Sequence, residues 1–209
     1  PTTAATNQSP AEEKEDEVNG IYDKSNEQIR IPKFPPTNPA AAPSHYCGDF
    51  RVRRCSNCVL TLDDAFGALR LQDLKNCTIY AGPVAGPLYV ENCTNCTIVV
   101  ASRQLRIHDT YDTQFFVNVR SGPIIEDCAR TKFGRYRLSF KTKDMEEMFK
   151  VAGLSLDRGG ESTFWRDVKD FKWHRATKSP NFDLIEDGSA GSKLVSKDVA
   201  NVEFIGEGG

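Results

Sequence analysis

One unit of sequence recurs every 17 to 19 residues along the middle of this chain. Its clearest mark is a series of small side chains in equivalent positions: Cys58, Cys77, Cys96, Thr113 and Thr131. Apolar triplets recur in step with this series, at residues 50–52, 69–71, 88–90, 105–107 and 123–125. Self-similarity at a fixed period is typical of solenoids, whose units bury their apolar sides only by stacking on one another.

The units have the pattern of short strands rather than of helix pairs. Each holds runs of three to five β-prone residues, broken by Asn, Asp, Gly and Pro, without helical periodicity. We therefore predict an all-β fold, a right-handed parallel β-helix of about five coils over residues 46–140, because parallel crossovers are right-handed. Asn76, Asn92 and Asn95 are expected in its turns, where asparagine tolerates left-handed backbone and can form ladders with its neighbours.

The segments on either side of the repeats differ from them in composition. Residues 1–44 contain an acidic run and a proline-rich stretch, which predict a flexible, disordered linker before a domain of residues 45–209. Within the C-terminal extension, residues 141–209, a helix is expected at residues 143–151, with its apolar face covering one side of the coils. The aromatic residues of 153–185 predict a tail packed on the β-helix, with partner contact as the alternative.

The chain has seven cysteines, and two pairs of them, Cys55 with Cys58 and Cys93 with Cys96, have the spacing of zinc ligands. The repeat offers another explanation. One set of equivalent positions reads Cys55, Leu74, Cys93, Thr110 and Cys128, so that leucine and threonine replace cysteine freely. We therefore interpret the cysteines as small packing residues and expect no metal site. An odd number of cysteines suits a reducing compartment.

Composition argues against several functions. The net charge of −2 and the pI of about 6.0 predict no nucleic-acid footprint. No apolar run approaches the roughly 20 residues of a membrane span. The chain shows no glycine-rich phosphate loop and no recognisable Ser/His/Asp arrangement, so we expect no enzyme active site. Because it begins at Pro1 without a methionine, we expect it to be a fragment of a longer protein.

Alternation along the strands decides which side chains point outward. Leu105 and Ile107 are predicted to point inward, so that Gln104, Arg106 and His108 point out. Stacking then predicts two neighbouring outward columns: Arg51, Arg70, Tyr89, Arg106 and Ile124 in one, and Arg53, Gln72, Glu91, His108 and Glu126 in the other. From the residues alone, we favour an ordinary solvated face over a functional site as the interpretation of this set.

Several blocks resemble the tubulin-folding cofactor C family, namely residues 82–90, 104–108, 119–128, 170–173 and 179–181. The similarity runs from about Tyr46 to Ile185. Relatives with this β-helical domain include the X-linked retinitis pigmentosa protein, which acts on a small GTPase, and the cyclase-associated actin-binding proteins. In the cofactor and the retinitis pigmentosa protein, the family implies an arginine finger that enters the nucleotide site of a partner GTPase. Carried over to this sequence, the finger is Arg106, with Gln104 as its neighbour and Glu126 as a supporting acid.

The resemblance therefore implies a GTPase-activating protein that acts in trans and is not itself an enzyme. It would need no cofactor of its own and would act on GTP bound to β-tubulin, during assembly of the αβ-tubulin heterodimer with the other tubulin-folding cofactors. A monomer is expected, in the cytoplasm and associated with the cytoskeleton. Two alternatives remain open at this point: activation of a small Arf-like GTPase, and a non-catalytic scaffold that binds actin or tubulin.

Overall fold

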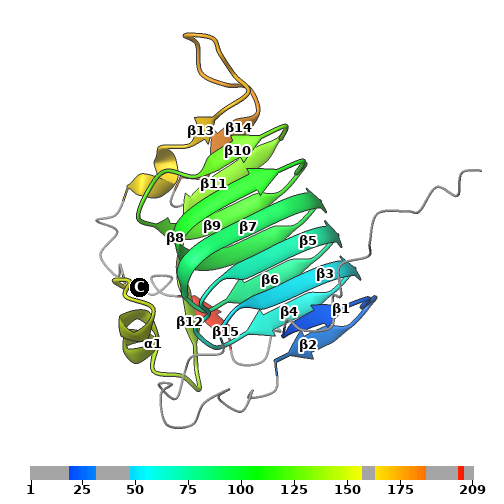
Figure 1. The fold of residues 1–209 in the computed structure, drawn as a ribbon, viewed down its shortest axis with the longest axis vertical. Coiled ribbons are helices and arrows are strands. Elements are labelled where there is room, and N and C mark those ends of the chain that lie inside the picture. Colours follow the sequence, from blue (N-terminus) through cyan, green and yellow to red (C-terminus); the bar gives the residue numbers. More distant parts are fainter. Residues whose placement is uncertain (1–18, 32–47, 157–162, 187–201, 205–209) are drawn as a thin grey trace, which may run out of the picture.

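A computed structural model describes residues 19–31, 48–156, 163–186 and 202–204 of the chain. They form a parallel β-helix with one helix beside it (Figure 1). The strands are β1 (Gly20–Tyr22), β2 (Gln28–Arg30), β3 (Phe50–Ser56), β4 (Val59–Leu62), β5 (Leu69–Lys75), β6 (Thr78–Ala81), β7 (Val84–Thr94), β8 (Thr97–His108), β9 (Gln114–Val119), β10 (Ile124–Glu126), β11 (Thr131–Arg135), β12 (Leu138–Phe140), β13 (Lys169–Asp170), β14 (Phe182–Leu184) and β15 (Val202–Phe204). The helices are α1 (Met145–Val151) and the short 3-10 turn η2 (Phe164–Arg166).

The predicted coils are confirmed, each with one strand on either side of a corner. They are β3 with β4, β5 with β6, β7 with the first part of β8, the second part of β8 with β9, and β10 with β11. Each strand pairs in parallel with its counterpart in the next coil. One inward column, for example, runs through Val52, Leu71, Val90, Ile107 and Ile125. Stacking is thus in the register that the repeat predicts.

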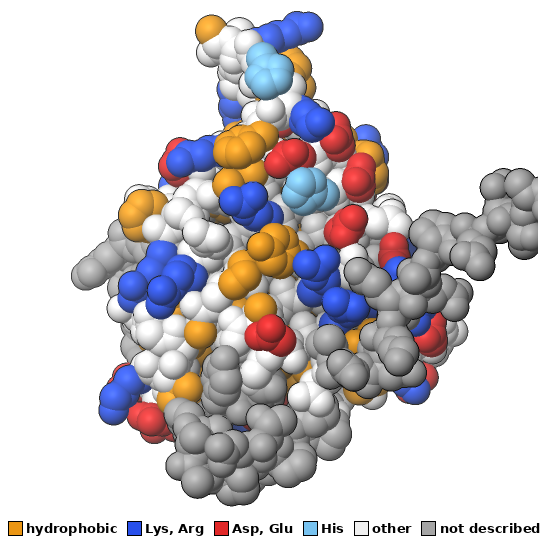
Figure 2. Space-filling view, in the orientation of Figure 1, with side chains coloured by type: hydrophobic (Ala, Val, Ile, Leu, Met, Phe, Trp, Pro, Cys, Tyr) orange, Lys and Arg blue, Asp and Glu red, His pale blue; other side chains and the backbone are white. Residues whose placement is uncertain are grey.

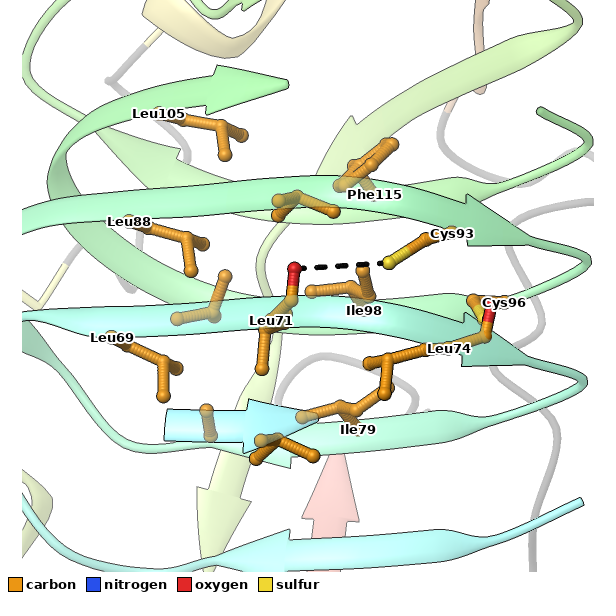
Figure 3. Packing of buried hydrophobic residues seen from close by; sticks show 14 of the residues in the cluster. Leu69, Leu71, Leu74, Ile79, Leu88, Cys93, Cys96, Ile98, Leu105 and Phe115 are labelled. Atoms are coloured by element: carbon orange, nitrogen blue, oxygen red, sulfur yellow. Dashed lines mark hydrogen bonds between the residues drawn. The ribbon is translucent and has the colours of Figure 1, made fainter. Parts of the chain in front are cut away.

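The interior of the coils is filled by the apolar and cysteine columns (Figure 3). Leu71, Leu88 and Leu105 are at most 1 % exposed. The six cysteines of the described segments are buried and free, and their thiols donate to backbone carbonyls, as Cys93 does to Leu71 at 3.9 Å. Burial raises the pKa of Cys93 to about 12 and that of Cys128 to about 11. The cysteines therefore pack the interior, as the repeat indicates, and the absence of a metal stays a prediction.

Polar residues in left-handed backbone form the corners of the coils. In each coil two such residues stand three apart, as Asn92 and Asn95 do with φ angles of 51° and 53°. Asparagine reaches this region at lower cost than most residues because its short side chain can hydrogen-bond locally. The amide of Asn95 donates to Asn76 at 2.9 Å, and Asn76 donates to Asn57 at 2.9 Å. The ladder expected from the sequence is therefore present and ties successive corners together.

An additional coil precedes the predicted ones. β1 pairs with β3, β2 pairs with β4, and Asp23 and Asn26 adopt the left-handed corner geometry of the other coils. The prediction of a flexible linker over residues 1–44 is therefore wrong for residues 19–31, while residues 1–18 and 32–44 lie outside the described residues. The physical reason is that the buried Ile21 continues the inner column of Val52, so that this segment has an apolar surface to stack on.

The C-terminal extension also adds strands to the helix. β13 pairs with β10 and β14 pairs with β11, so that part of the extension continues the coils. The expected packing of the aromatic residues holds for Trp165 and Phe182, which are 4 % and 9 % exposed. It is wrong for Phe164 and Phe171, whose side chains are 51 % and 49 % exposed. Those two rings are available to contact another molecule.

Helix α1 covers one outward face of the β-helix, as predicted. Asp144 caps it by accepting from the backbone N–H groups of Glu146 and Glu147. The apolar face of α1, with Met145, Met148 and Phe149, packs on outward side chains of β6, β8 and β9, namely Tyr80, Val99 and Phe116. Together with the antiparallel pair β12–β15, they form a second core. Within the described segments, neither helix has the length and apolar character needed to cross a membrane.

Candidate functional site

The predicted site lies on the face of the β-helix that α1 does not cover. In the second part of β8, Leu105 and Ile107 are buried, whereas Gln104 and Arg106 are exposed and His108 is half-buried. The alternation predicted from the sequence is therefore confirmed. Tyr89 and Ile124 are the lateral neighbours of Arg106 on β7 and β10, as the column alignment indicates.

The backbone that carries Arg106 is held on both sides. β8 pairs with β7 on one edge and with β10 on the other. Ser102, which is fully buried, donates its hydroxyl to the carbonyl of Gln104 at 3.2 Å. The register of β7 shifts between Val84 and Pro87, opposite Gln104. At Gly86, within that shift, a Cβ atom would come within 2.6 Å of the Gly67 carbonyl oxygen, so β7 is in close contact with the chain at Gly67.

The guanidinium of Arg106 has no hydrogen-bond, ion-pair or ring partner among the residues that the structure describes. Other arginines of the same face are engaged. Arg53 donates to Asp73 at 3.1 Å, and Arg70 lies 5.1 Å from the centre of the Tyr89 ring. Arg106 therefore combines a fixed backbone with a cation whose donors no described residue occupies, so that they can bind an external anion.

Glu126 lies on the same face but close to a different side chain. Its Oε1 atom is 4.0 Å from Nε2 of His108, at side-chain exposures of 24 % and 39 %. Within the described residues it forms no ion pair with Arg106. Gln104 projects from the strand of Arg106, and its side-chain amide makes no hydrogen bond to the described residues. The structure thus brings Gln104, Arg106 and Glu126 to one surface without a hydrogen bond or ion pair among the three.

Charge is distributed unevenly along this face (Figure 2). In the first predicted coils the two outward columns contain Arg51, Arg53 and Arg70. Toward the C-terminal coils, basic, acidic and histidine side chains are mixed with apolar ones. Arg106 stands in the mixed part, between Tyr89 and Ile124. An anion held there would meet a cation with apolar neighbours, where electrostatic attraction is less screened than in open water.

The positions of two residues on this face were not predicted from the sequence. Lys169 of β13 is aligned with Ile124 and so extends the column of Arg106. Phe171 donates its backbone N–H to the carbonyl of Ile125 at 3.0 Å, and its ring is exposed. The repeat could not reveal them, because a long insertion separates β10 from β13. The only signal was the Asp170-Phe171-Lys172-Trp173 block, whose position on the coils the sequence does not give.

Comparison with known proteins gives consistent matches. A family described as Tubulin binding cofactor C matches residues 47–171. Tubulin-folding cofactor C of Arabidopsis thaliana is 38 % identical over 138 residues, and Tubulin-specific chaperone C of Homo sapiens is 35 % identical over 138 residues. Each alignment covers 66 % of this chain and 38 % of the relative, so the chain spans well under half of either relative.

A solved structure agrees with the sequence matches. The structure of Tubulin Binding Cofactor C from Leishmania major is similar to this chain with a TM-score of 0.56 and 28 % sequence identity. The similarity covers 63 % of this chain and 86 % of the other. The fold of this chain is therefore similar to that of a protein whose name agrees with the family match.

Proposed function

Since this chain belongs to the tubulin binding cofactor C family, we propose that its β-helix is a GTPase-activating domain for tubulin, with Arg106 as the arginine finger. The proposed partner is GTP-bound β-tubulin, during assembly of the αβ heterodimer with the other tubulin-folding cofactors in the cytoplasm. The observation that supports this most is the outward guanidinium of Arg106, which has no partner among the described residues and stands on a strand paired along both edges.

The chemistry of GTP hydrolysis suits such a group. Negative charge spreads over the oxygens of the transferred phosphoryl group in the transition state, and a planar guanidinium can donate to two of them at once. A finger supplied in trans accelerates hydrolysis by roughly 10³ to 10⁵, which corresponds to about 4–7 kcal/mol of barrier. The strand under Arg106 fixes its backbone in advance, so that less entropy is lost when the finger enters the nucleotide site.

Gln104 and Glu126 have supporting roles in this proposal. Gln104 projects from the same face two residues before the finger, where its amide can hydrogen-bond to the guanidinium or to the partner's nucleotide loop. Glu126 stands next to His108 rather than Arg106, which favours contact with a basic residue of the partner over orientation of the finger. Both residues should therefore matter less than the arginine.

The proposal is tested by single-turnover GTP hydrolysis by tubulin in the presence of the other folding cofactors. Arg106→Ala should lower the stimulated rate by roughly 10³-fold or more. Arg106→Lys should be nearly as inactive, because a compact ammonium lacks the two-pronged geometry. The concentration of half-maximal stimulation should change little, since the finger acts mainly in the transition state. Gln104→Ala and Glu126→Ala should each lose less than Arg106→Ala.

Lys132→Ala provides a control, because it removes an exposed cation from β11. This strand pairs with β9 and not with the part of β8 that carries Arg106. It should keep the wild-type rate. An Arg106→Ala protein that stimulates hydrolysis as well as the wild type would refute the finger and favour a non-catalytic scaffold. Stimulation of an Arf-like GTPase without stimulation of tubulin would instead identify a small GTPase as the partner.

A further inference from the structure

A loop projects beyond the last coil of the β-helix, over residues 171–181 between β13 and β14 (Figure 1). Most of its side chains are exposed, so it contributes little to either hydrophobic core. It contains the end of one block and the whole of another that resemble the cofactor family, residues 170–173 and 179–181. The proposed finger mechanism gives this loop no role.

The loop is held in one shape by a clasp at its base. The carboxylate of Asp170 accepts from the hydroxyl of Ser179 at 2.6 Å, from the side-chain amide of Asn181 at 2.8 Å and from the backbone N–H of Lys172 at 3.1 Å. Ser179 is 6 % exposed, so part of this clasp is shielded from water. Nearer the tip, the indole N–H of Trp173 donates to the Thr177 carbonyl at 2.7 Å.

The clasped loop presents three cationic side chains and a histidine. Lys172, His174, Arg175 and Lys178 are exposed, and no acidic residue occurs between Asp170 and Asp183. Arg175 lies 5.0 Å from the centre of the Trp173 ring, which supports its position. At the base, Lys172 pairs with Asp127 and Lys178 pairs with Asp183, each at 3.5 Å. Both pairs are exposed, so a carboxylate of another molecule can compete for the two lysines. Figure 2 shows basic and histidine side chains together on the projection.

The loop emerges on the same face as the proposed finger. Arg106, Ile124 and Lys169 are aligned on successive strands, and neighbouring strands lie about 4.8 Å apart. The base of the loop is therefore about 10 Å from the strand of Arg106. A protein docked over Arg106 would meet the loop at one edge of its contact surface.

We propose that residues 171–178 form a docking arm that binds a short acidic peptide segment of the protein on which Arg106 acts. This inference rests on the proposed function for the identity of that protein. Because the clasp fixes the loop beforehand, binding loses less conformational entropy than it would with a mobile loop. Attraction between this arm and an acidic segment would speed association and align the partner with the finger.

The surroundings favour an acidic peptide over a nucleic acid. The base of the loop carries carboxylates, among them Asp127 and Asp183, and the whole chain has a net charge of −2. A nucleic acid requires a longer basic stripe along its phosphates, and these carboxylates would repel its continuation past the loop. A segment of a few acidic residues fits a patch of four basic side chains.

The test combines charge reversal in the loop with direct binding to purified αβ-tubulin. The double variant Arg175→Glu/Lys178→Glu leaves Asp170, Ser179, Asn181 and Trp173 in place. It should weaken binding by about tenfold at low salt, with a smaller loss at high salt, while the maximal rate of stimulated GTP hydrolysis stays within about twofold. Lys132→Glu/Lys150→Glu makes the same change in net charge elsewhere and should leave binding unchanged. Arg175→Ala/Lys178→Ala should give an intermediate loss even if the reversed variant folds poorly.

A labelled glutamate-rich peptide tests the arm without tubulin and without GTP hydrolysis. The wild-type chain should bind this peptide with salt-sensitive affinity, and the loop reversal should abolish the binding. The arm thus remains testable even if Arg106 proves not to activate a GTPase. Equal binding losses in the loop and control variants would overturn the proposal. Tighter binding of a single-stranded oligonucleotide than of the peptide would also overturn it, in favour of a nucleic-acid contact.

Discussion

The two outward faces of the β-helix are formed by the same coils but carry different side chains. On one face the outward column runs through Tyr80, Val99 and Phe116, all buried under α1 and its neighbours. On the other, Arg106 and Gln104 are exposed. Because inward side chains from the strands of both faces fill the interior of the coils, the outward positions can vary without loss of the fold. One outward face adds a second core, and the other is available for a partner.

Within the exposed face, Arg106 also differs from its neighbours in its side-chain contacts. Gln72 donates to Glu91 at 2.7 Å and Arg53 donates to Asp73 at 3.1 Å, so that several polar side chains satisfy one another along the axis. Arg106 does not take part in such contacts among the described residues. Exposed pairs of this kind contribute little to stability. The stability of the chain should therefore depend on the covered face, and the proposed activity on the open one.

The largest expected effect on stability is at the covered face. Phe149→Ala removes a ring that is 1 % exposed and packs 5.8 Å from the Tyr136 ring, which should cost about 3–5 kcal/mol of unfolding free energy. Arg106→Ala should change the same quantity by no more than about 0.5 kcal/mol. Urea denaturation followed by far-ultraviolet circular dichroism measures both. Similar losses for the two variants would contradict the division of roles between the faces.

The corner that joins the two faces should show an intermediate effect. Asn76 has a φ of 53° and hydrogen-bonds to both Asn57 and Asn95. Asn76→Ala should therefore lower the unfolding free energy by about 1–2 kcal/mol, because alanine is strained in left-handed backbone. Asn76→Gly loses the same hydrogen bonds without that strain and should cost less. The same denaturation assay compares them. If the alanine and glycine variants are equally stable, the left-handed geometry is not what the corner selects for.

The smallest expected effect is a pH dependence of the projecting loop. Burial alone would raise the pKa of Asp170, but the hydrogen bonds from Ser179 and Asn181 outweigh it and hold that pKa below its usual value. A carboxylate with a lowered folded-state pKa stabilises the structure above the unfolded value of about 3.9 and loses this effect as pH falls through the folded value. The loop clasp should thus persist at neutral pH and open only in acid.

The indole N–H resonance of Trp173 reports on this clasp. Its chemical shift should stay constant from neutral pH down to about pH 4 and change below that value. Asp170→Asn keeps a similar shape without the titrating group, and should remove the acid transition. A transition of the indole resonance centred above about pH 5 would show that another group controls the loop.

Most of the β-helix could be predicted because its units recur at nearly constant spacing, 17 to 19 residues. The inward columns through Cys58, Cys77 and Cys96 are in the register that their spacing indicates. The N-terminal coil was missed although Asp23 and Asn26 follow the corner pattern. In that coil Lys24 and Glu27 occupy the positions that Cys55 and Cys58 occupy in the next coil. Charged residues are tolerated at these positions because an end coil has a neighbour on one side only. The long segment between β2 and β3 also breaks the period.

For the site, the sequence could predict direction but not contacts. Alternation fixes Arg106 on the outer face, whereas side-chain rotamers decide which neighbour Glu126 approaches, and in the structure this is His108. Lys169 and Phe171 join the face through the pairing of β13 with β10, across an insertion that no periodicity spans. Long-range contacts of that kind follow from the fold as a whole.

The central claim is that Arg106 acts on the transition state of a partner GTPase rather than on its ground state. Binding of the chain to tubulin loaded with GDP and aluminium fluoride, compared with GDP alone, measures this most directly. The wild type should prefer the transition-state mimic by roughly 10²-fold or more, and Lys132→Ala should keep that preference. Arg106→Ala should bind both forms with similar affinity. An Arg106→Ala protein that retains the wild-type preference would contradict the account.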